Sequence, residues 1–531
     1  MAPAAGRPSL TVLAALDSAR TQMYHLKAIA IAGMGFFTGA YDLFCISTVS
    51  RLLGRLYFEG EKYEPQDRPS RQPMAVDDMV VGVALVGTLM GQLAFGYLGD
   101  RLGRKRIYGV TLVLMAVCAL GSGMSFGSSR RAVVGTLCFF RFWLGVGVGG
   151  EHPLSATIMC EYANRKARGA FMAAVFAMQG VGIIFACLVS MVVSGVFLRC
   201  NPAPAWREDR QRSAQLPAAD YVWRVVLMFA AFPALATLYW RMKLPETARY
   251  TALVAGDGKQ AAMDMQAVLD VPMDGEQEKV SRYRAANEYP LLSREFARRH
   301  GRHLVGTATT WFLLQITFYS QNLTQKDVFE AIRLTSNPAN MNALEEVFQL
   351  SRAMFLVALL VTFPGYWVAV AIIDKLGRRL IQLVGFLMMS VFLLAMGLMP
   401  RNHNNVLFAL LYALTLFFAS LGPNCSTFVL AAELFPARLR STCHAISAAA
   451  GTAGAITTAY EIQNLNIRGY MVTIKKGLVM LAITNFLGFF LTFLIPETMG
   501  QSLEEISGED DNASIRADSV VDMSVDEKSP V

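Results

Sequence analysis

Long apolar segments separated by short polar ones dominate the chain. Each apolar segment is roughly 20 residues long, the length of helix that crosses the hydrocarbon core of a bilayer. Six such segments precede residue 241 and six follow residue 302. The pattern therefore predicts an all-α membrane protein with twelve transmembrane helices in two six-helix halves. The predicted spans include residues 28–49, 107–127, 132–154 and 169–197, then 303–323, 350–373, 379–399, 405–430, 440–460 and 476–495.

A polar, charged stretch separates the two groups of spans. It contains no apolar segment long enough to cross a membrane, and its mixed charges favour short amphipathic helices in a cytoplasmic linker. Residues 51–78 are also polar and predict an external loop, while the acidic, Ser-rich sequence from Gln501 predicts a flexible end. The predicted boundaries are an N-terminal tail at 1–26, a first half at 27–241, the linker at 242–302, a second half at 303–496 and a C-terminal tail at 497–531.

Three short motifs occur once in each half, in the same order. A repeat of this kind is typical of transporters built from two parallel six-helix units. Basic clusters in the motifs follow the even-numbered spans, so the positive-inside rule predicts that both termini are cytoplasmic. The paired segments are Asp100–Lys105 and Asp374–Arg379, Glu161–Arg168 and Glu433–Arg440, and Pro245–Thr247 and Pro496–Thr498.

The charged residues of these repeats predict ion pairs that gate the protein. Basic residues alone can set topology, but a duplicated aspartate and glycine are not needed for that. We therefore interpret Asp100 and Asp374 as a latch that holds helix ends together in one state; the alternative is that the motifs only mark topology. The residues assigned to gating or ion pairs are Asp100, Arg104, Arg141, Glu161, Arg168, Asp374, Arg378, Glu433 and Arg440.

Composition supports a membrane protein and argues against other classes. The 531 residues are 54% hydrophobic and 17% charged, with a net charge of +8, and the mean hydropathy is +0.38. A soluble chain carries about 25% charged residues. Lys and Arg lie in short clusters beside apolar segments, which argues against nucleic-acid binding. The eight Cys form no CxxC pair, and no catalytic triad, metal cluster or phosphate-binding loop is present. We therefore expect neither an enzyme nor a cofactor or metal site.

Polar side chains inside the apolar segments are the candidate functional groups, because charge at membrane depth is costly. Arg141, Gly145 and His152 share one helix face. Arg141 could be a functional partner for a buried acid or an anion beside a cavity, or it could form only a structural ion pair within the N-terminal half, and both remain open. Gln179 is a lone amide in the fifth span, and Asp42 is an acid in the first. Each of these amides and charges could contact a substrate or only another helix.

Two later spans carry further polar groups. In the seventh, Trp311, Gln315, Tyr319 and Asn322 fall on one stripe at helical spacing. Such a stripe could line a cavity and donate hydrogen bonds to an oxyanion, or it could consist of interfacial aromatics and helix contacts. In the tenth, the sequence Gly-Pro-Asn ending at Asn424 breaks the helical hydrogen-bond ladder, which suits a substrate contact.

The segment GGEHPLSATIMCEYANRKARGAFMAAVFAMQG at 149–180 resembles the signature of the plant high-affinity inorganic phosphate transporters. These are the phosphate/proton symporter branch of the major facilitator superfamily. The likeness extends from SARTQMYH at 18–25 to PETMGQSLEEISGE at 496–509. It implies a major facilitator fold and uptake of inorganic phosphate with protons across the plasma membrane by alternating access. The substrate-binding positions it implies are Gln179, Trp311, Gln315, Tyr319, Asn424, His152 and Thr452.

Several positions depart from the family pattern. The family has Asp at Gly39, Asp-Tyr at Glu151-His152, Asp at Gln315 and Lys at Thr452. Gln315 cannot carry a proton, so any proton coupling would fall to Asp42, Glu151 or His152. Histidine titrates near neutral pH by default. Losing an Asp and the Lys together keeps the net charge of the site, which makes the paired loss more tolerable than either alone.

Two alternatives to the symporter follow from these departures. One is a receptor-like paralogue that binds phosphate but transports little. The other is a transporter of another anion, such as an organic phosphate. The resemblance also implies that kinases and trafficking factors act on serines of the C-terminal tail. The candidate serines are Ser514, Ser519, Ser524 and Ser529.

Overall fold

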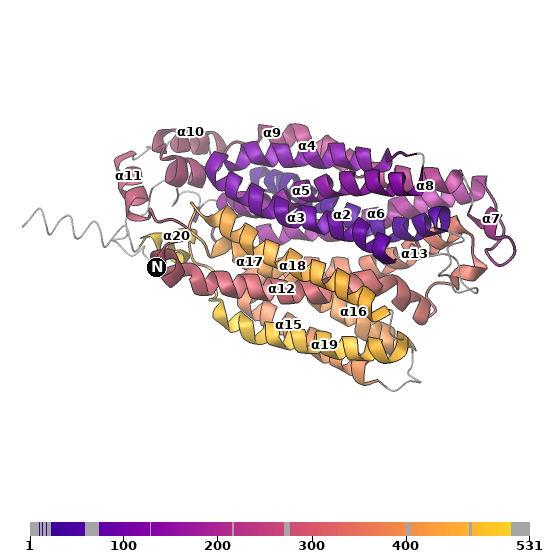
Figure 1. The fold of residues 1–531 in the computed structure, drawn as a ribbon. Helices are drawn as coiled ribbons and strands as arrows, with labels where there is room; N and C mark the ends of the chain where they lie inside the picture. The colour runs from indigo at the N-terminus through magenta and orange to yellow at the C-terminus, as the bar shows by residue number, and fades with distance from the viewer. Residues whose placement is uncertain are drawn as a thin grey trace, which may run out of the picture.

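The computed structural model is a bundle of long helices that run roughly along one axis (Figure 1). The residues it describes are 10, 13, 17–18, 23–58, 74–127, 129–214, 217–269, 277–399, 405–466 and 470–510. The first half consists of α2 (Met23–Tyr57), α3 (Met74–Leu102), α4 (Arg104–Gly123), α5 (Arg130–Tyr162), α6 (Arg168–Cys200), α7 (Arg210–Ser213), α8 (Ala218–Met228) and α9 (Ala231–Lys243). The second consists of α12 (Arg294–Ala331), α13 (Ala343–Val357), η3 (Ala358–Thr362), α14 (Phe363–Leu376), α15 (Arg378–Leu398), α16 (Asn405–Leu421), α17 (Pro423–Glu433), α18 (Arg440–Asn466), α19 (Tyr470–Leu491) and η4 (Thr492–Leu494).

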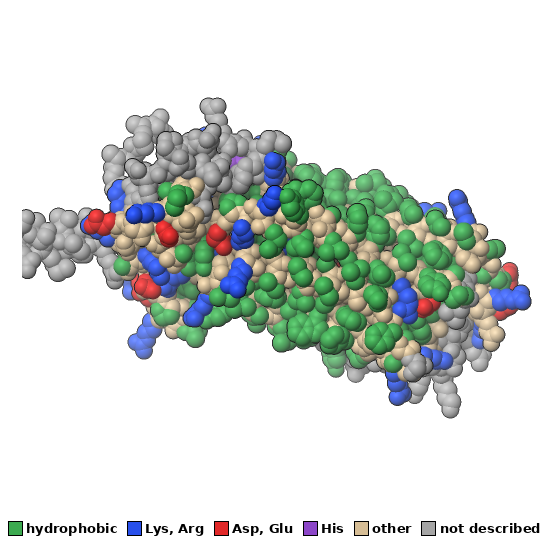
Figure 2. Space-filling view, turned by 90° about the horizontal axis from the view of Figure 1, so that it is seen from above, with side chains coloured by type: hydrophobic (Ala, Val, Ile, Leu, Met, Phe, Trp, Pro, Cys, Tyr) green, Lys and Arg blue, Asp and Glu red, His purple; other side chains and the backbone are tan. Residues whose placement is uncertain are grey.

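Ten segments in the described part of the chain are long and apolar enough to cross a membrane. Helices α12 and α18 lie in the same bundle and complete the twelve that the hydropathy pattern predicts. Figure 2 shows an apolar surface over the middle of the bundle, with Lys, Arg, Asp and Glu towards its two ends. Exposed residues such as Phe139, Trp240, Leu360 and Met480 contribute to the apolar surface. This distribution is that of a protein surrounded by lipid.

One end of the bundle carries the linker, and we call it the linker end. There lie η1 (Tyr250–Ala255), α10 (Gly258–Leu269), α11 (Gln277–Ala286) and the short α20 (Leu503–Ile506), while α7 marks the far end (Figure 1). Helix α20 begins with a capping box, in which Ser502 and Glu505 satisfy each other's main-chain N–H groups. The expectation of a flexible end starting at Gln501 is therefore wrong for residues 501–510. The four candidate tail serines lie outside the described residues.

Two helices extend beyond the spans predicted from hydropathy. Helix α2 continues to Tyr57, and Arg51 and Arg55 in its last turns are buried, so the predicted external loop begins too early. Helix α12 begins at Arg294, because Ser293 accepts a hydrogen bond from the Phe296 N–H and caps the helix before its apolar part. Hydropathy finds where a helix is apolar, and both helices extend beyond that region.

The two halves meet along helices that face each other across the bundle. Helix α3 packs on α18, and α6 packs on α13 and α14. The break at Gly422 is present as expected: α16 ends at Leu421 and α17 begins at Pro423. Small residues allow the close contacts, since a Cβ on Gly96 of α3 would lie 2.2 Å from the Ala445 Cβ of α18. This interface encloses the candidate site.

Candidate functional site

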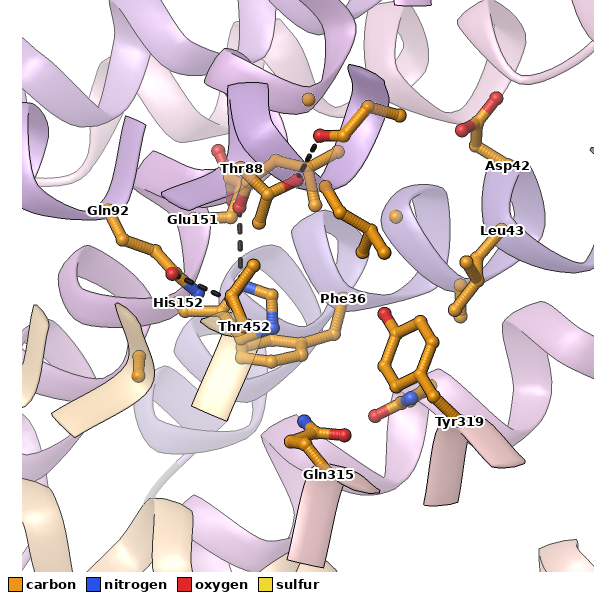
Figure 3. Close-up of a pocket in the computed structure, with 18 of the residues that line it drawn as sticks. Phe36, Asp42, Leu43, Thr88, Gln92, Glu151, His152, Gln315, Tyr319 and Thr452 are labelled. Carbon is orange, nitrogen blue, oxygen red and sulfur yellow. Dashed lines mark hydrogen bonds between the residues drawn. The ribbon is translucent and has the colours of Figure 1, made fainter. Parts of the chain in front are cut away.

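A cavity of about 100 Å³ lies between the halves in mid-bundle. It has room for several water molecules, and therefore for a small polyatomic ion. Helices α2, α3, α5 and α6 of the first half and α12, α17 and α18 of the second contribute its wall. Figure 3 shows side chains from both halves converging on the same space. The residues predicted from the sequence that line it are Asp42, Arg141, Glu151, His152, Gln179, Trp311, Gln315, Tyr319, Asn424 and Thr452.

Arg141 is paired with the buried acid Asp42 of the same half. Its Nη1 and Nη2 donate to the two Asp42 carboxylate oxygens at 3.1 and 3.0 Å, and its Nε donates to the Val80 carbonyl at 3.3 Å. Arg141 is 1% exposed and Asp42 is 7% exposed. The pair joins α5 to α2 within the first half. Arg141 therefore contributes little net charge to the cavity.

Glu151 is held by a residue that the sequence analysis missed. Arg241, at the end of α9, donates from Nη1 and Nη2 to the two Glu151 oxygens at 2.6 and 2.9 Å. Thr111 donates to the same carboxylate at 2.7 Å, and the Arg241 guanidinium lies 3.6 Å from the centre of the Tyr108 ring. All these groups are buried. Arg241 lies at the boundary between the predicted sixth span and the linker. A basic residue at such a boundary indicates topology, so the sequence did not predict its buried pair with Glu151.

His152 has a different environment from the two acids. Its Nδ1 lies 3.2 Å from the Val148 carbonyl, which can only accept, so we assign the proton of the neutral ring to Nδ1. Nε2 then carries the lone pair that can take a second proton. The Phe36 ring contacts the imidazole edge-on at a centroid distance of 5.0 Å. Among the described residues that line the cavity, both acids are in ion pairs, and His152 is the imidazole available to change charge.

Neutral polar groups make up the remainder of the site. Thr452 donates to the Gln92 Oε1 at 2.9 Å across the interface of the halves (Figure 3). Gln92 was missed, although a lone amide in the second span was a usable signal. Asn424 donates to the Tyr366 hydroxyl at 2.6 Å. The Gln315 Oε1 is buried and has no hydrogen-bond partner among the described residues.

The predicted stripe on the seventh span reaches the cavity only in part. Trp311, Gln315 and Tyr319 line it, whereas Asn322 lies in a smaller neighbouring pocket and donates to the Phe318 carbonyl at 2.7 Å. The helix continues past the cavity at that point. The Asn322 side chain therefore forms a hydrogen bond to the main chain of its own helix and does not line the cavity.

Between the cavity and the linker end, two ion-pair clusters related by the sequence repeat join the halves. Glu161 of the first half lies 3.2 Å from Arg104 and 3.1 Å from Arg440 of the second. In the second cluster, Glu433 lies 2.8 Å from Arg168 of the first half and 3.1 Å from Arg378. The threonines of the repeated Pro-Glu-Thr motif, Thr247 and Thr498, donate to Glu161 and Glu433 respectively.

The two predicted latch aspartates each cap a helix of the opposite half. Asp100 accepts hydrogen bonds from the N–H groups of Ser441 and Thr442, at 3.3 and 2.7 Å, where α18 begins. Asp374 accepts from the N–H groups of Gly169 and Ala170, at 3.1 and 2.7 Å, where α6 begins. A carboxylate at a helix N-terminus satisfies open donors and the helix dipole. Separating the halves at this end must break both contacts.

A further contact between the halves lies at the far end and was not predicted. Arg55 of α2 places Nε 2.7 Å from the Glu346 carboxylate of α13. Its Nη1 and Nη2 donate to the carbonyls of Met341 and Pro338 at 3.0 and 2.6 Å. The halves are therefore joined on both sides of the cavity. The sequence placed Arg55 in a loop, which hid it.

The family model described as "Sugar (and other) transporter" matches residues 27–509. The chain belongs to this family. Family membership, the twelve-helix bundle and its apolar surface make it a multi-pass membrane transporter and not an enzyme.

Individual relatives agree with the family assignment. The chain is 68% identical over 515 residues to "Inorganic phosphate transporter 1-11" of Oryza sativa subsp. japonica, covering 96% of this chain and 92% of the relative. It is 61% identical over 510 residues to "Low affinity inorganic phosphate transporter 4" of Lotus japonicus, covering 95% and 96%. The resemblance to plant phosphate transporters is confirmed, while the second name does not match the high-affinity class.

Solved structures share the fold. The proton:xylose symporter XylE of the major facilitator superfamily, bound to 6-bromo-6-deoxy-D-glucose, superimposes with a TM-score of 0.71 at 19% identity. The match covers 92% of this chain and 99% of that one. The predicted major facilitator fold is confirmed.

Proposed function

We propose that this family member imports inorganic phosphate together with protons across the plasma membrane by alternating access, with both termini in the cytoplasm. The names of its relatives support phosphate as the substrate. The positive-inside distribution of Lys and Arg supports the orientation, with the linker end facing the cytoplasm. The cavity supports a small anion, because its wall offers amide, indole, hydroxyl and imidazole groups.

The charge of the cavity is the observation that carries this proposal. Asp42 is cancelled by Arg141, and Glu151 by Arg241, so the described wall is close to neutral when His152 is neutral. A phosphate monoanion entering this low-dielectric space needs a positive partner. Imidazole is the side chain that gains a proton most readily near neutral pH. A proton on His152 Nε2 supplies the missing charge, so phosphate and proton bind best together.

Joint binding of this kind gives coupling without a titrating carboxylate. Phosphate without the proton leaves an uncompensated anion, and the proton without phosphate leaves an uncompensated imidazolium. Neither singly loaded state is stable enough in the closed cavity to cross efficiently. The Gln315 amide and the Trp311 indole can donate to phosphate oxygens but carry no charge in exchange.

Movement requires the contacts at the two ends to break in turn. Opening to the outside separates Arg55 from Glu346. Opening to the cytoplasm separates Glu161 from Arg440, Glu433 from Arg168, and the latch aspartates from the helix ends that they cap. The repeat places matching charges in both halves, so both clusters open in one rigid-body movement.

Uptake of radiolabelled phosphate in yeast that lacks its own phosphate transporters tests the proposal. We expect uptake to rise as external pH falls from about 8 to about 4.5 and to collapse with an uncoupler, since the proton gradient drives entry. Uptake insensitive to the uncoupler would contradict proton coupling. Surface expression with phosphate binding but no uptake would favour a receptor-like protein. Strong competition by an organic phosphate would favour another anion as the substrate.

A further inference from the structure

His444 of α18 is a buried imidazole just below the central cavity on the cytoplasmic side. Ala448 and Thr452, one and two turns further along the same helix face, line the cavity. The rings of Trp311 and Phe428 contact His444 edge-on, each at a centroid distance of 5.4 Å. The side chain is 0% exposed. The face of α18 that lines the cavity therefore continues towards the linker end as far as the His444 ring.

The main chain of Phe428 approaches one ring nitrogen of His444, and His152 of the first half is its other electrostatic neighbour. The second ring nitrogen has no hydrogen-bond partner among the described residues. A buried polar group without a partner lowers stability, and such groups in native proteins call for an explanation. One explanation is that a ligand binds the His444 ring in another conformation of the protein.

The turn before His444 is already an anion site. The N–H groups of Ser441 and Thr442 and the Thr442 hydroxyl, at 2.7 Å, bind the carboxylate of Asp100 at the beginning of α18. The Ser441 hydroxyl is buried beside them and has no partner among the described residues. Because helix side chains lean toward the N-terminus, His444 projects over this turn. His444 follows Ser441 by three residues, so the imidazole and the hydroxyl lie on the same side of α18, close to the N–H donors of the helix end.

Two of the groups that cover these donors, Asp100 and His152, belong to the other half of the protein. His444, Ser441, Thr442, Trp311 and Phe428 lie in the second half, whereas Asp100 and His152 lie in the first. Opening at the linker end removes Asp100 and His152 and leaves the donors together. The helix N-terminus then lacks its carboxylate and faces the path that leads from the cavity to the cytoplasm.

We propose that His444, Ser441 and the N-terminus of α18 form a second phosphate-binding position on the release path, present when the cytoplasmic side is open. The inference rests on the proposed function and deepens it. Phosphate leaving the cavity passes along one face of α18, from Thr452 to the position that Asp100 vacates. Return of Asp100 to the helix end then displaces the anion into the cytoplasm, because both oxyanions use the same donors.

Sided transport kinetics test this position. In proteoliposomes with oriented protein, phosphate exchange is measured while the concentration is varied on the cytoplasmic face or on the external face. His444→Phe keeps the aromatic contacts and removes both nitrogens, and Ser441→Ala removes the hydroxyl. We expect each change to raise the cytoplasmic-side KM about five- to tenfold and to leave the external-side KM within about twofold. His444→Gln, which retains a donor, should restore part of the loss.

His303→Phe is the matched control, because His303 lies on α12 towards the linker end and outside the cavity wall. Equal changes of KM on both faces, or a cytoplasmic rise matched by an external fall, would indicate a conformational effect and overturn the second position. An unchanged KM would overturn it as well. In each of these cases the wild-type protein still exchanges phosphate. A folded wild-type protein that exchanges no phosphate would instead overturn the proposed function, and the release position with it.

Discussion

Arg141 of α5 binds both carboxylate oxygens of Asp42 of α2, at 3.1 and 3.0 Å, inside the first half. The arginine that sequence reasoning offered as an anion ligand is thereby neutralised. Arg241 is neutralised in the same way by Glu151. We therefore propose that His152, an imidazole in the described wall of the cavity, gains a proton and so supplies the positive charge for a bound anion.

Replacing His152 with Gln should remove the acid stimulation of phosphate uptake. Gln keeps a hydrogen-bond donor towards the anion but cannot supply a positive charge. Because the side chain that carries the proton is lost, uptake at acid pH should fall about tenfold or more. Uptake against external pH in yeast measures both effects. The control is His303→Gln, which removes an imidazole outside the cavity. A His152→Gln protein with an unaltered pH profile would exclude His152 as the proton carrier.

Thr452→Lys should weaken the dependence of phosphate KM on pH. A lysine at this position, where the related family carries one, places a permanent positive charge beside the Gln92 Oε1, which can accept from it. Phosphate then no longer needs the proton on His152. We expect KM to change less than about twofold across a pH range over which the wild type changes about tenfold. A pH dependence as steep as the wild type would mean that the cavity charge does not limit binding.

Glu151→Gln should lower stability because it leaves the buried Arg241 without its counter-ion. Breaking a buried pair from one side costs about 3–5 kcal/mol. Thermal unfolding of the purified protein would show a clear fall in Tm, and the double variant Glu151→Gln/Arg241→Gln should recover much of it. The exposed pair of Glu278 with Arg282 is the control, since Glu278→Gln should change Tm little. Equal Tm for wild type and Glu151→Gln would contradict the assigned pair.

The fold could be read from the sequence because its signals are periodic and long. Apolar segments gave the number of spans, and the motif beginning at Asp100 and repeated at Asp374 gave the two halves. The helix ends at Tyr57 and Arg294 could not be read, because a membrane helix stays helical after its apolar part ends. Capping and tertiary contacts decide such boundaries.

The sequence could predict which residues line the cavity, but not which acid forms an ion pair with which base. Polar residues in apolar segments identified the cavity wall, and all of Gln179, Gln315 and Asn424 reach it. Which acid meets which base depends on the rotation of each helix, and hydropathy does not report rotation. The partner of Arg141 could not be predicted for that reason, and the structure shows that it is Asp42. Arg241 was missed because it lies at the boundary between a span and the linker, and Gln92 because the lone amide of the second span was not considered.

Asp100→Asn should loosen the contact between the halves at the linker end, which we propose faces the cytoplasm. It removes the charge that holds the N–H groups of Ser441 and Thr442, so the state open to the cytoplasm gains population. Cys160 reports the change, because its thiol is 0% exposed and faces the Ala432 carbonyl of the other half. We expect alkylation of Cys160 to accelerate about tenfold. The exposed Cys200 should react as in the wild type, and an unaltered Cys160 rate would contradict the latch.

Docking of the segment at 503–510 should weaken as pH rises. Burial raises the pKa of the Glu509 carboxyl to about 7, with Arg440 opposing and Glu504 reinforcing the shift. The docked state thus binds the proton more tightly than the released state. Docking is strongest below the ordinary carboxyl pKa of about 4.3 and loses strength as pH rises to about 7. Hydrogen exchange of 503–510 should slow in acid, beyond the chemical effect of pH, and Glu509→Gln should abolish that dependence.

Simultaneous recording of phosphate and proton entry tests the central claim most directly. Purified protein is placed in liposomes that contain a pH-sensitive dye, and labelled phosphate is added outside without a pH gradient. The account predicts that protons enter with phosphate through the wild type. In His152→Gln, any remaining phosphate entry should acidify the interior only by the protons that the phosphate monoanion itself releases. Phosphate entry through the wild type with no accompanying acidification would contradict the account.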